Sequence, residues 1–204
     1  MRYLLISFLF VTLVSCGTLA TTKNLVAKPV SKNLENPYFS NTKTDYVYKA
    51  KIDVNKNHLG GLLIVKKIAE NHHRVVFTTE FGNKIFDFEF IDNVFKMNAI
   101  LDKLNKKIVV NALKKDFQLL VTENNSVTKK FNSLDHTIYQ TNLNNKDNYY
   151  FVNKNKNLLE NIIMASKHKE KVSLLFDEVI SSLARNINIT HHNFNMTIQL
   201  NYIN

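Results

Sequence analysis

The chain has 204 residues, of which 45% are hydrophobic and 22% charged, a composition typical of a globular protein and incompatible with disorder of the whole chain. This length suits one domain with a substantial core, and only 4 Gly and 2 Pro exclude a fibrous or low-complexity protein. The net charge of +10 is carried mainly by dispersed lysines, which indicates a solvated surface or, as the alternative, a basic face toward anionic lipid head groups.

The first residues have the layout of a secretory signal. Met1 and Arg2 form a short basic start, and residues 3–14 form an apolar segment too short to cross a hydrocarbon core of about 30 Å as a helix. Leu13-Val14-Ser15-Cys16 then resembles the lipobox of bacterial lipoprotein signal peptides. The resemblance implies cleavage before Cys16 and a lipid on its thiol, which would anchor the chain in a membrane. A plain secretory signal with a chance cysteine is the alternative.

Cys16 is the only cysteine, so the mature chain can form no internal disulfide and no metal or nucleophile site based on cysteines. Residues 17–42 show no sustained periodicity and are predicted to be a flexible tether with a reach of roughly 25–30 Å. The expected organisation is therefore a signal peptide at 1–15, the lipidated cysteine and tether at 16–42, and one folded domain at 43–204. Membrane anchoring argues against nucleic acid as a partner.

The folded part opens with patterns typical of strands. Residues 46–54 alternate apolar and polar side chains, which predicts a half-buried strand, and residues 62–69 suit a more central one. Residues 74–90 predict two strands joined by a turn at Gly82 and Asn83, because glycine can adopt the positive φ of a tight reversal. A further short strand is expected at 95–97.

The second strand of this pair carries a ladder of three phenylalanines. Phe86, Phe88 and Phe90 fall on one face, while Asp87 and Glu89 fall on the other. Each ring buries roughly 150–250 Å², which is too much apolar area to leave in water. This face is therefore expected to contact a core, a ligand or a partner.

Residues 98–121 change to a helical period. The apolar side chains are spaced mostly three or four residues apart, at Leu101, Leu104, Ile108, Val109, Leu113, Phe117 and Leu120. The stripe shifts at residues 108–109, which predicts two helices or a bend near Asn105. A helix packed on the sheet is favoured over a free amphipathic helix on a membrane.

After residue 125 the strand pattern returns, with short candidates separated by turns rich in Asn and Lys. Residues 172–183 fit either a helix or a strand, and residues 194–202 have the clearest period of two in the chain. Strands, then a helical stretch, then strands predict an α+β fold. The expected architecture is a curved antiparallel sheet, or incomplete β-barrel, of roughly ten to twelve strands with two or three helices packed in its concave side.

Three features together resemble the LolA/LolB family, whose members carry or receive lipoproteins in the bacterial envelope. They are the lipobox at Cys16, the strand, turn and returning strand at residues 74–88, and the last two predicted strands at residues 184–203. The resemblance covers most of residues 45–203 in element order. It implies an incomplete β-barrel closed by helices around a hydrophobic cavity for acyl chains.

The candidate ligand wall combines the phenylalanine ladder with the helical stripe. Its members are Phe77, Phe86, Phe88, Phe90, Leu101, Leu104 and Phe117. A filled sheet core is the alternative interpretation of the same residues. The leading hypothesis is a monomeric lipoprotein, anchored in the outer membrane and facing the periplasm, that binds acyl chains of lipids or lipoproteins. The alternative is a non-enzymatic scaffold or assembly lipoprotein that binds a protein partner.

The sequence contains no recognisable catalytic motif, and neither a metal nor a cofactor is expected. The pairs His72-His73 and His191-His192 are adjacent, so in extended chain their side chains point to opposite faces and neither pair can chelate one metal. Histidines at the surface or in turns are the favoured interpretation. Asp87 and Glu89 share a face and could act as general acid and base, but a solvated outer face explains them more simply. We therefore expect a protein that is not an enzyme.

Overall fold

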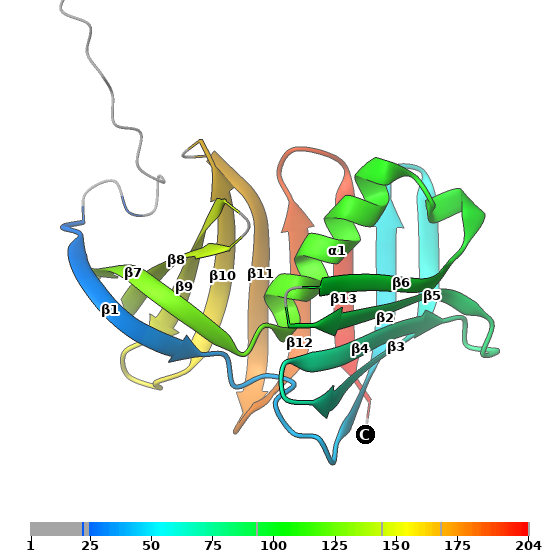
Figure 1. Cartoon of the computed structure of the whole chain (residues 1–204), viewed down its shortest axis with the longest axis horizontal. Helices are drawn as coiled ribbons and strands as arrows, with labels where there is room; N and C mark the ends of the chain where they lie inside the picture. Colours follow the sequence, from blue (N-terminus) through cyan, green and yellow to red (C-terminus); the bar gives the residue numbers. More distant parts are fainter. Residues whose placement is uncertain (1–21, 23–24, 93, 144, 168, 204) are drawn as a thin grey trace, which may run out of the picture.

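The computed structural model describes residues 22, 25–92, 94–143, 145–167 and 169–203. Within these ranges, thirteen strands form a single antiparallel sheet, and one α-helix, α1 (Lys107–Val121), lies across the concave side of that sheet (Figure 1). No helix of the described residues is long and apolar enough to cross a bilayer. The predicted signal peptide and Cys16 lie outside the described residues.

The strands follow one another along the chain, with α1 inserted between the sixth and the seventh. They are β1 (Lys28–Glu35), β2 (Asp45–Val54), β3 (Asn57–Ala69), β4 (His72–Thr78), β5 (Lys84–Ile91), β6 (Val94–Ile100), β7 (Asn124–Asn132), β8 (His136–Leu143), β9 (Lys146–Asn153), β10 (Leu159–Ser166), β11 (Lys169–Ile180), β12 (Leu183–His191) and β13 (Met196–Tyr202).

The spatial order of the strands is β1-β7-β8-β9-β10-β11-β12-β13-β2-β3-β4-β5-β6, so β1 and β6 are the two edges of the sheet. The closing strand β13 pairs with β2, where Ile198 lies opposite Ile52, and this pairing joins the two halves of the chain. Both residues are buried, as the period of two predicts for strands that have one face in a core.

The prediction of an α+β fold with two or three helices is wrong, because the described residues form one α-helix and a mostly β structure. The first half of the expected helical stretch is instead the end of β6 followed by a short 3-10 turn, η2 (Asp102–Leu104). The backbone is extended at Leu101 (ψ 134°) and again at Lys106 (ψ 130°). The apolar residues at helical spacing therefore extend over the end of β6 and the η2 turn, and only those in the second half of the stretch lie in a helix.

The sheet also begins earlier than the boundary predicted at residue 43. Strand β1 lies inside the range expected to be a tether, and it pairs with β7 through its backbone. Most of its side chains are exposed, so it shows no apolar alternation that a sequence pattern could reveal. Tyr38 and Phe39, which follow β1, are buried in the main core.

The ambiguous stretch at residues 172–183 is not helical: residues 172–180 belong to β11, and residues 181–182 form the turn to β12. Val172, Leu174 and Phe176 are buried on one face, whereas Leu175 is 47% exposed and Ile180 is 56% exposed. A helix with the alternative spacing would have needed both of these exposed residues in the core.

The main core lies between α1 and the concave face of the sheet. Phe86 stacks on Phe88 with ring centroids 4.6 Å apart, and Phe77 lies 5.4 Å from Phe86. Phe117 of α1 packs against Phe86 at 5.5 Å. The phenylalanine ladder therefore meets other side chains of the protein.

A second apolar cluster lies on the opposite face of β7 to β10. Its members are Phe131, Ile138, Tyr149, Phe151, Ile163 and Ala165, with Leu25 packed against them. Tyr150, the neighbour of Tyr149, points to the main core instead. Strands in this half of the sheet are therefore apolar on both faces, which explains why their sequences alternate less cleanly than that of β13.

Candidate functional site

A pocket of about 320 Å³ opens between the first half of α1 and the ends of four strands. We call it the α1 pocket. Its walls come from α1, the start of β9, the β10–β11 hairpin and the turn from β12 to β13, which are Ile108, Asn111, Ala112, Lys115, Lys146, Met164, Ser166, Lys171, Val172, His191, Asn193 and Phe194. This volume is at the lower end of the range for small-molecule sites.

The helix contributes one face to the α1 pocket. Ile108, Asn111, Ala112 and Lys115 are spaced by three and four residues, so they line up along one side of α1. Ile108 is 61% exposed, which is unusual for so large an apolar side chain and places it at the open side of the pocket. The opposite face of α1, with Leu113 and others, packs into the main core.

The α1 pocket is basic. Lys115, Lys146 and Lys171 line it, and no carboxylate does. Lys146 Nζ donates a hydrogen bond to Ser166 Oγ at 3.0 Å, which holds this ammonium at the end of β10. Within the described ranges none of the three lysines forms an ion pair. The charge of Lys115 acts on the buried carboxyl of Asp116, its neighbour on α1.

A buried histidine in the wall of the α1 pocket is paired with a buried aspartate of α1. His191 lines the pocket and its Nε2 lies 2.8 Å from Asp116 Oδ2, while both side chains are almost fully buried. The other oxygen, Asp116 Oδ1, is buried and has no hydrogen-bond partner among the described residues. Burial raises the pKa of Asp116, and the hydrogen bond to His191 opposes that rise. The expectation that His191 is a surface histidine is therefore wrong, because α1 covers it.

The predicted ligand wall divides into buried and exposed members. Six of its residues are buried in the main core, and Leu101 is 40% exposed beyond the end of β6. Of the seven, only Phe90 lines one of the pockets described here, a polar pocket separate from the α1 pocket. Their role as ligand contacts stays a prediction.

The acidic pair opposite the phenylalanine ladder is not a solvated face, contrary to expectation. Asp87 is fully buried, and both of its oxygens accept hydrogen bonds from Arg74, at 2.9 Å and 2.7 Å. Lys84 Nζ donates a third at 2.7 Å. The Arg74 guanidinium holds the pKa of Asp87 well below its usual range, so this carboxylate is a fixed anion and a poor proton donor.

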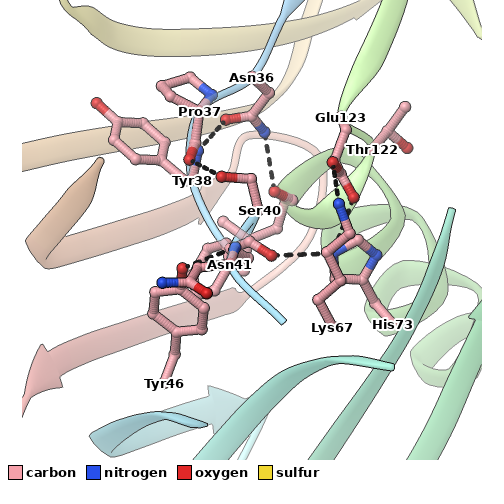
Figure 2. A network of polar contacts seen from close by, with 12 residues as sticks. Asn36, Pro37, Tyr38, Ser40, Asn41, Tyr46, Lys67, His73, Thr122 and Glu123 are labelled. Atoms are coloured by element: carbon pink, nitrogen blue, oxygen red, sulfur yellow. Dashed lines mark hydrogen bonds and ion pairs between the residues drawn. The ribbon is translucent and has the colours of Figure 1, made fainter. Parts of the chain in front are cut away.

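A second pocket, of about 250 Å³, lies beside the end of α1 and is lined mainly by polar residues, with His73 and Glu123 among them. Figure 2 shows the network that borders it. Lys67 Nζ lies 2.6 Å from Glu123, and the His73 ring meets the carbonyl oxygen of Phe39 at 3.1 Å. Asn36 Nδ2 donates to the carbonyl of Leu120 at 3.0 Å. These contacts join the segment after β1 to the helix and to β3 and β4, which indicates a structural connection.

Sequence reasoning missed the site on α1 because its parts are far apart in the chain. Asp116 and His191 are separated by 75 positions, and nothing in either local pattern connects them. The lysines of the pocket look like any others on a basic chain. The one local signal was Ile108, which lies where the apolar stripe shifts.

No protein-family model matches the sequence, and no curated protein matches it significantly. Among solved structures, the chain is similar to a LolA superfamily protein from Nitrosomonas europaea, with 9% identity over 83% of this chain and 88% of that one, at a TM-score of 0.49. It is also similar to a domain from Vibrio parahaemolyticus assigned to outer membrane lipoprotein sorting, with 8% identity over 78% and 83% and a TM-score of 0.45. With identities below 10% and TM-scores below 0.5, these similarities say nothing about the ligands of this protein.

Proposed function

We propose that the protein is an envelope lipoprotein that binds an acyl chain of a lipid or of another lipoprotein in the α1 pocket. The observation that carries this proposal is the pocket itself, a concave site with an apolar wall between α1 and the sheet. The lipobox at Cys16 motivates the anchor, with the outer membrane facing the periplasm as the proposed location. We propose the α1 pocket rather than the phenylalanine ladder as the acyl site, because the ladder already packs against Phe117 of the protein itself.

The size of the pocket sets the expected affinity. Each buried methylene contributes about 0.8 kcal/mol, so a chain with roughly eight buried carbons would gain ~6 kcal/mol, a dissociation constant in the tens of micromolar. This suits a protein that receives and releases its ligand. A store with very tight binding would need a deeper cavity.

Displacement of a neutral fluorescent probe tests the proposal. N-phenyl-1-naphthylamine should bind the folded domain and be released by an alkyl ligand. Asn111→Trp should block binding, because residue 111 is exposed on the pocket face of α1 and can take an indole without disturbing the core. Lys103→Trp, on the exposed η2 turn outside the pocket, is the matched control. Equal probe binding by both variants would exclude the α1 pocket as the acyl site.

A second candidate function is a scaffold that binds a protein partner, and the free edge strand β6 favours it. Val94 and Met97 of this strand are exposed, and an open edge can add a strand from another chain. The wild-type protein should then recover a stoichiometric partner from envelope extracts, and a variant with Val94→Lys and Met97→Lys should lose it. Retention of that partner by the variant would exclude the β6 edge as its binding site.

A further inference from the structure

The three lysines of the α1 pocket come from three separate elements. Lys115 lies on α1, Lys146 at the start of β9 and Lys171 near the start of β11. All three line the same pocket, and no carboxylate is among its lining residues. Like charges at such a site repel one another, and an anion placed among them relieves the repulsion.

A β-bulge places one of these lysines. In the pairing of β10 with β11, Met164 lies opposite Val172 but Ala165 lies opposite Glu170, so Lys171 is an extra residue in the ladder. Lys171 and Val172 consequently both line the pocket, whereas neighbours in a regular strand point to opposite faces. The backbone N–H of His192 donates to the Lys171 carbonyl at 2.9 Å, which holds the bulge against the turn after β12.

The acidic residues nearest in sequence are directed elsewhere. Asp147 and Glu170 both pair with Ala165, a member of the cluster on the opposite sheet face, so their side chains belong to that outer face. Asp116, on the helix, is bound to His191 and buried. The sheet therefore separates charge, with cations toward the pocket and these two anions away from it.

Apolar side chains line the same pocket. Ile108, Met164 and Phe194 lie among the walls that also carry the lysines. A small inorganic anion would make no use of this apolar wall, and a neutral chain would bring no negative charge to the lysines. The combination fits a molecule with both parts.

We infer that the α1 pocket recognises an anionic amphiphile, in which a phosphate or carboxylate head group lies among Lys115, Lys146 and Lys171 and the first carbons of its alkyl chain contact Ile108, Met164 and Phe194. This inference rests on the proposed function and adds the class of ligand. The head group can belong to a membrane lipid or to a free acid, and both present the same charged oxygens to the lysines.

Titration calorimetry with four soluble probes tests the inference: decyl phosphate, decanoate, decanol and inorganic phosphate. We expect decyl phosphate and decanoate to bind more tightly than decanol and inorganic phosphate. Their affinity should fall as salt rises from about 0.1 M to 1 M, because screening shortens the reach of the lysine charges. Binding of decanol should not depend on salt.

The matched variants alter charge at and away from the pocket. The double variant Lys146→Gln and Lys171→Gln should bind decyl phosphate at least about tenfold more weakly, with decanol binding unchanged. Lys51→Gln with Lys129→Gln removes the same charge from exposed positions on β2 and β7 and should bind as the wild type does. Lys171→Arg should retain affinity. Unfolding midpoints of all variants would confirm that each is folded.

The outcomes separate the inference from the function on which it rests. If decanol and decyl phosphate bind equally in wild type and in the double variant, the acyl site stands and the anionic class is wrong. If inorganic phosphate binds as tightly as decyl phosphate, the pocket is a plain anion site, which also overturns the inference. If none of the four binds, both the inference and the proposed function fail.

Discussion

Asp87 shows how a single residue can combine a predictable position with an unpredictable environment. Its place opposite the phenylalanine ladder follows from the period of two. Its full burial does not, because it results from the Arg74 and Lys84 side chains that lie over it. A buried carboxylate with several charged hydrogen bonds stabilises the fold only while all of its partners remain.

Replacing Asp87 by Asn should lower the free energy of unfolding by about 1–3 kcal/mol at pH 7, because Arg74 and Lys84 lose their counter-ion. Glu80→Gln is the control, since Glu80 and Lys49 are exposed and 3.7 Å apart, and it should change stability by no more than about 0.5 kcal/mol. Urea denaturation measures both.

The effect of Asp87→Asn should depend on pH in one direction. The pKa of Asp87 is lowered in the folded state, so its stabilisation is present above the pKa of an unfolded aspartate, about 3.9, and is lost as pH falls below that value. The difference between the two proteins should therefore narrow between about pH 5 and pH 3. A constant difference across this range would contradict the assignment.

His73 is the buried histidine of the network in Figure 2. Burial lowers its pKa, although the hydrogen bond to the carbonyl of Phe39 opposes this effect. The unfolded chain then takes up the proton first as pH falls. Stability should therefore decline below about pH 6.5, by no more than ~1.4 kcal/mol per pH unit.

His73→Gln tests this assignment, because glutamine can still donate to the Phe39 carbonyl but does not titrate. The free energy of unfolding of the variant should vary less than that of the wild type between about pH 7 and pH 5. Denaturant titrations at several pH values provide the measurement. Parallel curves for the two proteins would assign the pH dependence to other groups.

At the scale of elements, two adjacent glycines of β3 have different roles. A Cβ on Gly61 would lie 1.9 Å from the carbonyl oxygen of Thr78 in β4, whereas a Cβ on Gly60 would meet nothing within 4 Å. The close approach occurs where the pairing of β4 with β5 shifts between Phe77 and Thr78. Gly61 therefore permits a backbone contact that no other residue allows.

Gly61→Ala should destabilise the protein by about 1–3 kcal/mol, because the strands must move apart to admit the methyl group. Gly60→Ala, one residue away on the exposed face, should be neutral or stabilising by up to about 1 kcal/mol. Thermal unfolding of the two variants side by side measures the contrast. Equal effects would mean that β3 and β4 are not as close as described.

At the scale of the whole molecule, the segment between β1 and β2 connects parts of the sheet that are distant in the strand order. Tyr38 donates a hydrogen bond to the carbonyl of Leu159 in β10, and Asn36 binds the carbonyl of Leu120 in α1. Phe39 packs edge-on against Tyr46 of β2 at 5.0 Å. These contacts hold α1 and both halves of the sheet together.

A chain that begins at residue 43 should therefore be much less stable than one that begins at residue 25. It lacks β1, which leaves the edge of β7 open, and it lacks the buried Tyr38 and Phe39. Removal of one such ring alone costs about 3–5 kcal/mol, so we expect the shorter chain to unfold or aggregate. Circular dichroism and size-exclusion chromatography provide the comparison, and similar melting temperatures would restore the boundary at residue 43.

The alternation of side chains along single strands was readable from the sequence alone, because it depends only on the local backbone period. Phe86, Phe88 and Phe90 are buried together as that period requires. The same is true of the closing strand, where Met196, Ile198 and Leu200 are buried. The number of helices and the strand β1 were not readable, because an apolar spacing can cross a turn and an edge strand can pair through its backbone only.

The candidate site depended entirely on the tertiary structure. Asp116 meets His191, and Lys115 joins Lys146 and Lys171, only because the sheet curves around α1 and brings β9, β11 and the end of β12 against one face of the helix. A local pattern carries the direction of each side chain but not the curvature of thirteen strands. That curvature arises from twist, bulges and packing summed over the whole sheet. The sequence therefore predicted a ligand wall at the phenylalanine ladder, whereas the open pocket of the folded protein lies beside another face of α1, at residues that no local pattern connects.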